Sequence, residues 1–140
     1  MDDFKGRLTR DGIRIHDADD FAGMLRAGQV AAGILDAMAP LVYPGQTTEA
    51  IDAEIERMVN AAGVTSATIG YRGYQHASCI SVNHVVCHGI PGPKVLKDGD
   101  ILNIDVTVIV DGWFGDTSRM YVAGTLGRKA ERLVQVTHDA

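Results

Sequence analysis

The feature that most constrains the fold is an Asp-Gly pair between two stretches that suit β-strands. Asp111 and Gly112 separate residues 101–110, which are rich in Val and Ile, from the aromatic residues Trp113 and Phe114. An Asp-Gly pair in this setting is a strong signal for a tight β-hairpin turn. The sequence therefore predicts an antiparallel hairpin in the second half of the chain.

The register of this hairpin brings two carboxylates together. With a loop of two or four residues centred on the Asp-Gly pair, Thr107 lies opposite Asp116. Because side chains alternate along a strand, Asp105, Thr107 and Asp116 then share one face. Asp105 and Asp116 become diagonal neighbours, roughly 7–8 Å apart at the backbone. Such carboxylates repel each other unless a cation lies between them, and their oxygen atoms suit a divalent metal ion.

An alternative remains open for this pair. One of the two carboxylates can instead face water or cap a turn. A loop with an odd number of residues would shift the register by one position and place the two side chains on opposite faces.

Two histidines lie near the end of the preceding apolar stretch. His84 and His88 have the four-residue spacing of a zinc pair on a helix. Residues 77–87, however, are predicted to form a strand, in which four residues span about 13 Å, so the pair is not expected to bind one ion. His88 alone, placed where this strand meets the turn at 89–91, is a candidate functional residue.

The first half of the chain predicts two amphipathic helices. Apolar residues recur at helical spacing over residues 21–38, after acidic residues at 19–20 that favour a helix N-terminus. A second apolar stripe covers residues 51–62. Thr47 or Thr48 can cap this helix.

The helical and strand segments form one α+β unit. Residues 1–18 are predicted to be an arm with one short strand around 13–15, and residues 19–140 to be the N-terminal part of a domain. The last stretch, residues 128–140, predicts a third helix.

Composition and charge exclude several classes of protein. With 13 basic and 18 acidic residues, the formal net charge is −5, which argues against binding nucleic acid through phosphate neutralisation. Cys79 and Cys87 lack CxxC spacing and predict buried, reduced thiols, as in a cytoplasmic protein. We expect neither a signal peptide nor a membrane span, because no long uncharged apolar run is present.

Six segments carry recognisable motifs: Gly70–Tyr74, Cys79–Asn83, Val85–Pro91, Leu96–Asp100, Asn103–Thr107 and Gly115–Ser118. In order and spacing, these segments together resemble the type I methionine aminopeptidases. The Cys-His-Gly-Ile-Pro and Asn-Ile-Asp-Val-Thr forms are similar to the bacterial branch of that family. The resemblance implies a pita-bread α+β fold, whose first half is an antiparallel sheet covered by two amphipathic helices.

The resemblance also implies an activity and its cofactors. The family removes the initiator methionine from new polypeptides when the next residue is small, which makes the ribosome a possible partner. Two divalent metal ions (Co, Mn, Fe or Zn) would be bound at the centre. By motif position, Asp105 would bind one ion and Asp116 would bridge the two.

Other matched positions imply roles around the substrate. His88 would be the catalytic histidine that hydrogen-bonds the substrate near the scissile bond. Tyr71, Tyr74 and Cys79 would line the pocket for the methionine side chain. Asn83 would lie near a monovalent cation.

The resemblance covers a little over half of a family member. The remaining metal ligands of the family, one His and two Glu, belong to the second half of the fold and have no match here. We therefore expect an N-terminal fragment that is inactive alone. The alternative is a non-enzymatic binding module of the same fold, or a repurposed truncated protein. The sequence that follows Ala140 would distinguish them.

Overall fold

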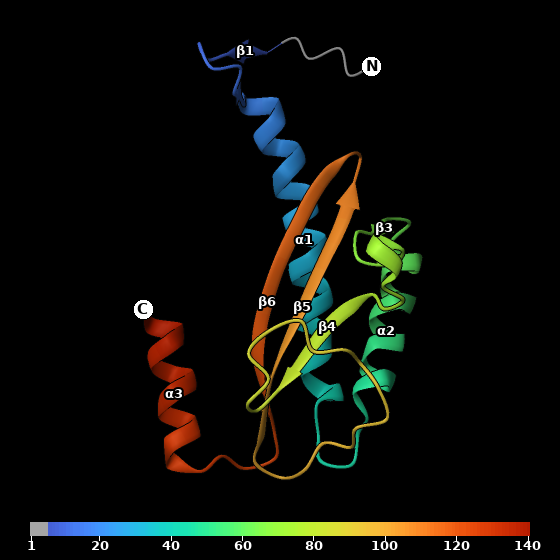
Figure 1. The fold of residues 1–140 in the computed structure, drawn as a ribbon, viewed down its shortest axis with the longest axis vertical. Helices are drawn as coiled ribbons and strands as arrows, with labels where there is room; N and C mark the ends of the chain where they lie inside the picture. The colour runs from blue at the N-terminus through green and yellow to red at the C-terminus, as the bar shows by residue number, and fades with distance from the viewer. Residues whose placement is uncertain (1–5) are drawn as a thin grey trace.

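The computed structural model describes residues 6–140, and its centre is a four-stranded antiparallel sheet. Two helices, α1 (Ala18–Met38) and α2 (Thr48–Ala61), pack on the same face of this sheet, whereas α3 (Arg128–Asp139) stands apart from them (Figure 1). A short 3₁₀ turn, η1 (Ala39–Leu41), ends the first helix. The predicted α+β architecture, a sheet covered by two amphipathic helices, is confirmed.

The long strand β5 (Asp100–Val110) organises the sheet. It pairs along its whole length with β6 (Trp113–Ala123). On its other side it pairs with β4 (Ser78–Val82) and, further along, with the short β3 (Thr65–Ser66). All of these pairings are antiparallel, as predicted.

The hairpin between β5 and β6 has the predicted two-residue turn. Asp111 and Gly112 both have positive φ angles, 51° and 84°, as a type I′ turn requires. Val110 therefore pairs with Trp113, and Thr107 pairs with Asp116. The register inferred from the sequence is confirmed.

Alternation along β5 divides the sheet into an apolar and a polar face. Four alternate residues of β5 are completely buried and pack against both helices, while Asn103, Asp105 and Thr107 point to the opposite face. The buried set comprises Leu102, Ile104, Val106 and Val108 on β5, with Ile34 and Leu35 on α1 and Ile51 and Ile55 on α2. The core thus leaves the polar face free for a site.

The helix termini differ from expectation only in detail. Asp17 caps α1, where Asp19 and Asp20 were expected to start the helix: its carboxylate accepts the backbone N–H of both. Thr47 caps α2 by accepting the N–H of Ala50. The apolar residues expected in the first turns of α1, such as Phe21, are exposed, because this end of the helix extends beyond the sheet (Figure 1).

The strand expected over residues 77–87 is shorter. β4 ends at Val82, where Asn83 adopts a left-handed conformation (φ 54°) that turns the chain. His84 and His88 therefore lie in a loop, and the strand spacing used to separate them does not apply. The N-terminal segment also differs, since it forms two short paired strands, β1 (Arg7–Leu8) and β2 (Arg14–Ile15), in place of one. Part of the predicted arm, residues 1–5, lies outside the described residues.

The helices of residues 6–140 include none that is long and apolar enough to cross a bilayer.

The contact between α1 and β6 depends on a glycine. A Cβ atom at Gly115 would overlap the backbone carbonyl of Ala27, whereas one at Gly28 would meet no atom within 4 Å. We expect Gly115→Ala to lower the free energy of unfolding by about 2 kcal/mol or more, because the helix must move away from the sheet. Gly28→Ala, the matched control at a partly buried position of α1 with room for a methyl group, should stabilise the chain by up to about 1 kcal/mol. Urea denaturation measures both, and equal effects would contradict this packing.

Candidate active site

The two predicted metal ligands lie on the polar face of the hairpin. Thr107 is paired with Asp116, and its hydroxyl donates a hydrogen bond of 2.9 Å to the Asp116 carboxylate. Asp105 lies two residues from Thr107 on the same strand and therefore on the same face. The predicted juxtaposition of Asp105 and Asp116 is confirmed, while metal binding by them stays a prediction.

The electrostatics of this pair are unfavourable without a cation. Burial raises the pKa of the Asp105 carboxyl, and the nearby Asp116 carboxylate raises it further, whereas His88 acts in the opposite direction. The donor set fits a divalent ion, because both groups offer carboxylate oxygens. Among the described residues, however, no group of three or more His, Cys, Asp or Glu side chains could hold a metal. Two carboxylates are too few to enclose an ion.

A cavity of about 670 Å³ opens beside the carboxylate pair. This volume is within the roughly 300–1,000 Å³ typical of small-ligand sites. Its wall contains Thr107, the residue that links the cavity to Asp116. The lining residues are Ala67, Thr68, Tyr71, Arg72, Gly73, Tyr74, Cys79, His88, Ile90, Thr107 and Phe114. All four residues predicted to contact substrate are therefore brought together in one mainly apolar pocket.

His88 reaches this cavity through a loop that folds back on β4. The Ile80 N–H donates to the Gly89 carbonyl at 2.8 Å, and the Gly89 N–H donates to the Ser81 hydroxyl at 3.1 Å. A Cβ atom at Gly89 would overlap the backbone of Ile80, so only glycine allows this approach. The position predicted at a strand end is thus set by the returning loop.

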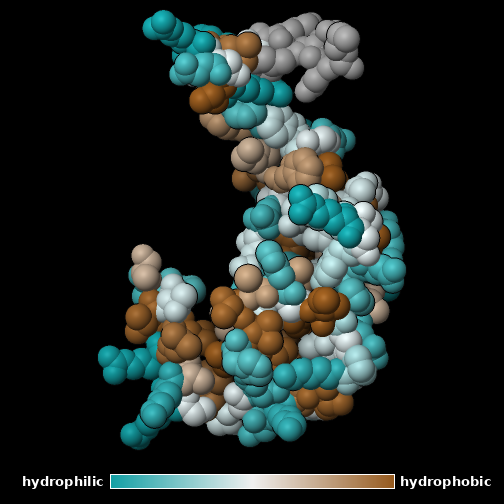
Figure 2. All heavy atoms as spheres, viewed as in Figure 1, coloured by the Kyte–Doolittle hydropathy of each residue, from teal (hydrophilic) through white to brown (hydrophobic). Residues whose placement is uncertain are grey.

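Asn83 lies away from the cavity. Its side-chain amide donates to Asp100 at 2.8 Å, and its oxygen accepts the backbone N–H of Ile101 at 3.1 Å. It lines a different groove of about 390 Å³ between the sheet and α3, where apolar side chains gather on both sides (Figure 2). The structure does not bring Asn83 together with the other predicted residues, and its role near a monovalent cation stays a prediction.

The wall of the cavity is carried by a segment with little regular structure. Tyr71 belongs to a short 3₁₀ turn, η2 (Tyr71–Gly73), in which Arg72 has a φ angle of 49°. Tyr74 and Cys79 follow, and the Cys79 thiol donates to the Tyr74 hydroxyl at 3.5 Å. Burial raises the pKa of both groups, so each is neutral at physiological pH.

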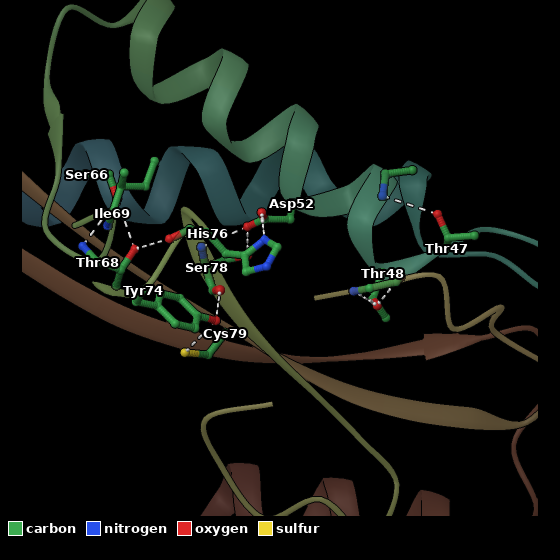
Figure 3. Close-up of polar contacts among 12 residues, drawn as sticks. Thr47, Thr48, Asp52, Ser66, Thr68, Ile69, Tyr74, His76, Ser78 and Cys79 are labelled. Atoms are coloured by element: carbon green, nitrogen blue, oxygen red, sulfur yellow. Dashed lines mark hydrogen bonds and ion pairs between the residues drawn. The ribbon is translucent and has the colours of Figure 1, made fainter. Parts of the chain in front are cut away.

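Sequence reasoning assigned no role to Asp52 and His76, which lie next to this wall. Asp52 is only 4% exposed on α2, and its carboxylate lies 2.9 Å from the Nδ1 atom of His76 (Figure 3). One signal was available, because an acidic residue beside Ile51 and four positions after Thr48 falls on the apolar face of the predicted helix. A charge on an apolar helix face indicates a buried partner.

Comparison with known proteins establishes the class of this fold and site. The family model described as "Metallopeptidase family M24" matches residues 22–140, and the chain belongs to this family. Membership of a metallopeptidase family implies the use of a divalent metal. The pita-bread fold predicted from the sequence is confirmed by the solved structures that the chain matches.

Within this family the chain is similar to bacterial methionine aminopeptidases, as predicted. It is 48% identical to the methionine aminopeptidase of Rickettsia prowazekii over 91% of this chain and 49% of that protein. It is 46% identical to the methionine aminopeptidase of Escherichia coli K12 over the same shares of the two chains. The crystal structure of the Rickettsia protein superposes with a TM-score of 0.89, over 91% of this chain and 51% of that chain. The chain thus spans about half the length of these relatives.

The two cysteines should differ in reactivity. The predicted burial of both thiols is wrong for Cys87, which is exposed because the strand ends at Val82 and leaves it in the following loop. Cys79 is half-buried, and burial raises the pKa of its thiol. Because the thiolate is the reactive form, we expect iodoacetamide near pH 8 to alkylate Cys87 at least about tenfold faster than Cys79. Peptide mass spectrometry over time measures the two rates, and single Cys→Ser variants assign them. Equal rates would contradict the buried setting of Cys79.

Asp105→Asn should stabilise the metal-free chain. A carboxyl whose pKa is raised by folding adds stability below its ordinary pKa and loses it as the pH rises through the folded value. With EDTA near pH 7, the Asn variant should therefore melt at a higher temperature than the wild type, and the difference should disappear near about pH 3. Adding Mn²⁺ should raise the melting temperature of the wild type more than that of the variant.

Asp111→Asn is the matched control for this measurement. It removes one negative charge from the turn of the same hairpin, and Asn tolerates the positive φ angle found there. Its melting temperature in EDTA should stay close to that of the wild type. A gain equal to that of Asp105→Asn would show that net charge, not the Asp105–Asp116 contact, is responsible.

Proposed function

We propose that residues 19–140 form the N-terminal part of the catalytic domain of a methionine aminopeptidase. The observation that carries this proposal is the position of the Asp105 and Asp116 carboxylates beside an apolar cavity lined by Tyr71, Tyr74 and His88. The relatives support it, because proteins 46% and 48% identical to this chain are named methionine aminopeptidases.

The carboxylate pair would hold two divalent ions, of which Co, Mn, Fe and Zn are candidates. Asp105 would bind one ion and Asp116 would bridge both. Such ions supply a water of lowered pKa and polarise a peptide carbonyl. Three further ligands, one His and two Glu by family resemblance, would complete the site from outside the matched half.

The cavity would bind the methionine side chain of a peptide. Tyr71, Tyr74 and Cys79 offer aromatic and sulfur contacts, which suit a flexible thioether. His88, at the rim next to Asp105, would hydrogen-bond the substrate near the scissile bond and steady the developing charge. By family resemblance, the residue after the methionine would be small.

The setting of the reaction follows from the substrate. New polypeptides that still carry their initiator methionine would be the targets, in the cytoplasm and in the neighbourhood of the ribosome. Asn83 would lie near a monovalent cation with a structural role, at a distance from the cavity.

The proposal is tested by the cleavage of a Met-Ala-Ser peptide. We expect no turnover by the 140-residue chain with Co²⁺, Mn²⁺ or Fe²⁺, because two carboxylates neither retain the ions nor orient the reacting groups. The chain joined to the second half of the Rickettsia prowazekii relative should release methionine. His88→Ala in this hybrid should lower kcat by about 100-fold or more while leaving the metal content nearly unchanged.

Two results would contradict the proposal. A hybrid that binds metal and folds but releases no methionine would favour the alternative, a binding module with the same fold. Rapid turnover by the 140-residue chain alone would show that its site is complete without further ligands. Asp116→Asn in the hybrid is the control for metal binding, since it should lower the metal content and the activity together.

A further inference from the structure

A buried carboxylate on α2 is connected to the wall of the cavity. Asp52 accepts three hydrogen bonds: from the backbone N–H of Ser78 at 2.9 Å, from the Ser78 hydroxyl at 2.7 Å and from Nδ1 of His76 at 2.9 Å (Figure 3). Ser78 is completely buried at the start of β4. These bonds attach residues 76–78 to the helix.

The same residues contact the two pocket side chains. The Tyr74 hydroxyl donates to the Ser78 carbonyl at 2.8 Å and accepts from the Cys79 thiol at 3.5 Å. The His76 ring meets the Tyr74 ring edge-on, with centroids 5.5 Å apart. The His76 carbonyl also accepts the Thr68 hydroxyl at 2.7 Å. Tyr74 and Cys79 are therefore held from several directions by groups that Asp52 holds in turn.

The cavity wall needs such support because little else holds it. The segment before Tyr74 is a short 3₁₀ turn with positive φ angles at Gly70, Arg72 and Gly73, and its side chains are exposed. The Tyr74 hydroxyl bonds to Ser78 and Cys79 at the start of β4, which pairs with β5. The bonds of Asp52 to Ser78 and His76 connect this same segment to α2.

We infer that Asp52 and His76 are positioning residues for the proposed methionine side-chain pocket, because they fix the Tyr74 ring and the Cys79 thiol that line it. The inference rests on the proposed function for the identity of the ligand. The positioning itself concerns the geometry of the free chain and can be measured without metal or substrate.

His76 is the residue to vary first. Removing the Asp52 carboxylate would leave two buried donors of Ser78 without an acceptor, which endangers folding. The side chain of His76 is 30% exposed, and Asp52 keeps both hydrogen bonds from Ser78 when His76 is replaced. His76→Phe retains an aromatic ring beside Tyr74 but loses the Nδ1 donor. His76→Ala loses both the ring and the donor. His76→Asn restores a donor close to the Nδ1 position. Glu54→Gln, which weakens a surface ion pair with Arg57 on the same helix, is the matched control.

The measurement is the alkylation rate of Cys79 in the 140-residue chain carrying Cys87→Ser, without metal or ligand. If Asp52 and His76 hold the wall in place, His76→Ala and His76→Phe should raise this rate about five- to tenfold. Losing one hydrogen bond increases, by about that factor, the fraction of molecules in which the Cys79 thiol is accessible. His76→Asn should stay within about twofold of the parent, and Glu54→Gln should match it. Rates in His76→Ala and His76→Phe equal to the parent rate would overturn the inference.

A second arm separates this inference from the proposed function. Methionine amide should protect Cys79 of the parent chain from alkylation, whereas glycine amide should not. Absence of protection in the parent would contradict the proposed pocket, while the ligand-free rates would still decide the positioning.

Where methionine amide protects, the concentration of ligand that gives half-protection should rise about fivefold in His76→Phe. In His76→Asn this concentration should equal that of the parent. Unchanged half-protection in His76→Phe, with only its melting temperature lowered, would show a purely structural role and overturn the inference.

Discussion

The pairing of β5 with β6 across a two-residue turn is the constraint on which the rest of the structure depends. Eleven consecutive residue pairs share one register, and the register is set where Asp111 and Gly112 adopt positive φ angles. A shift by one residue would exchange the two faces of both strands. It would expose the apolar residues that contact the helices and would separate Asp105 from Asp116.

This pairing links stability to the candidate site because one face of β5 forms the core and the other face carries the carboxylates. The apolar face is buried against α1 and α2 and supplies the favourable free energy of burial. The polar face carries two carboxylates that repel each other, a cost that burial of the opposite face offsets. The unfavourable contact between Asp105 and Asp116 is thus maintained by packing on the other side of the sheet.

The cavity wall depends on a different kind of interaction. Tyr74 and His88 lie in loops and Cys79 lies near the start of β4, and contacts with residues far along the chain hold the segments that carry them. Asp52 reaches Ser78 across 26 positions of the sequence, and Gly89 approaches Ile80 closely enough to exclude any side chain. Both contacts direct pocket side chains without contributing a surface to the pocket.

The sequence by itself determined the elements whose signals are local. Strand propensity around an Asp-Gly pair sets the hairpin register and so the shared face of Asp105 and Asp116, and helical periodicity with a Thr cap identifies α2, because hydrogen bonds between near neighbours decide each of them. Only the tertiary structure decided that β4 ends at Val82, that the loop after it brings His88 back to the cavity, and that Asp52 and His76 support Tyr74. Those features arise from contacts between residues far apart in the chain, whose partners no local pattern specifies.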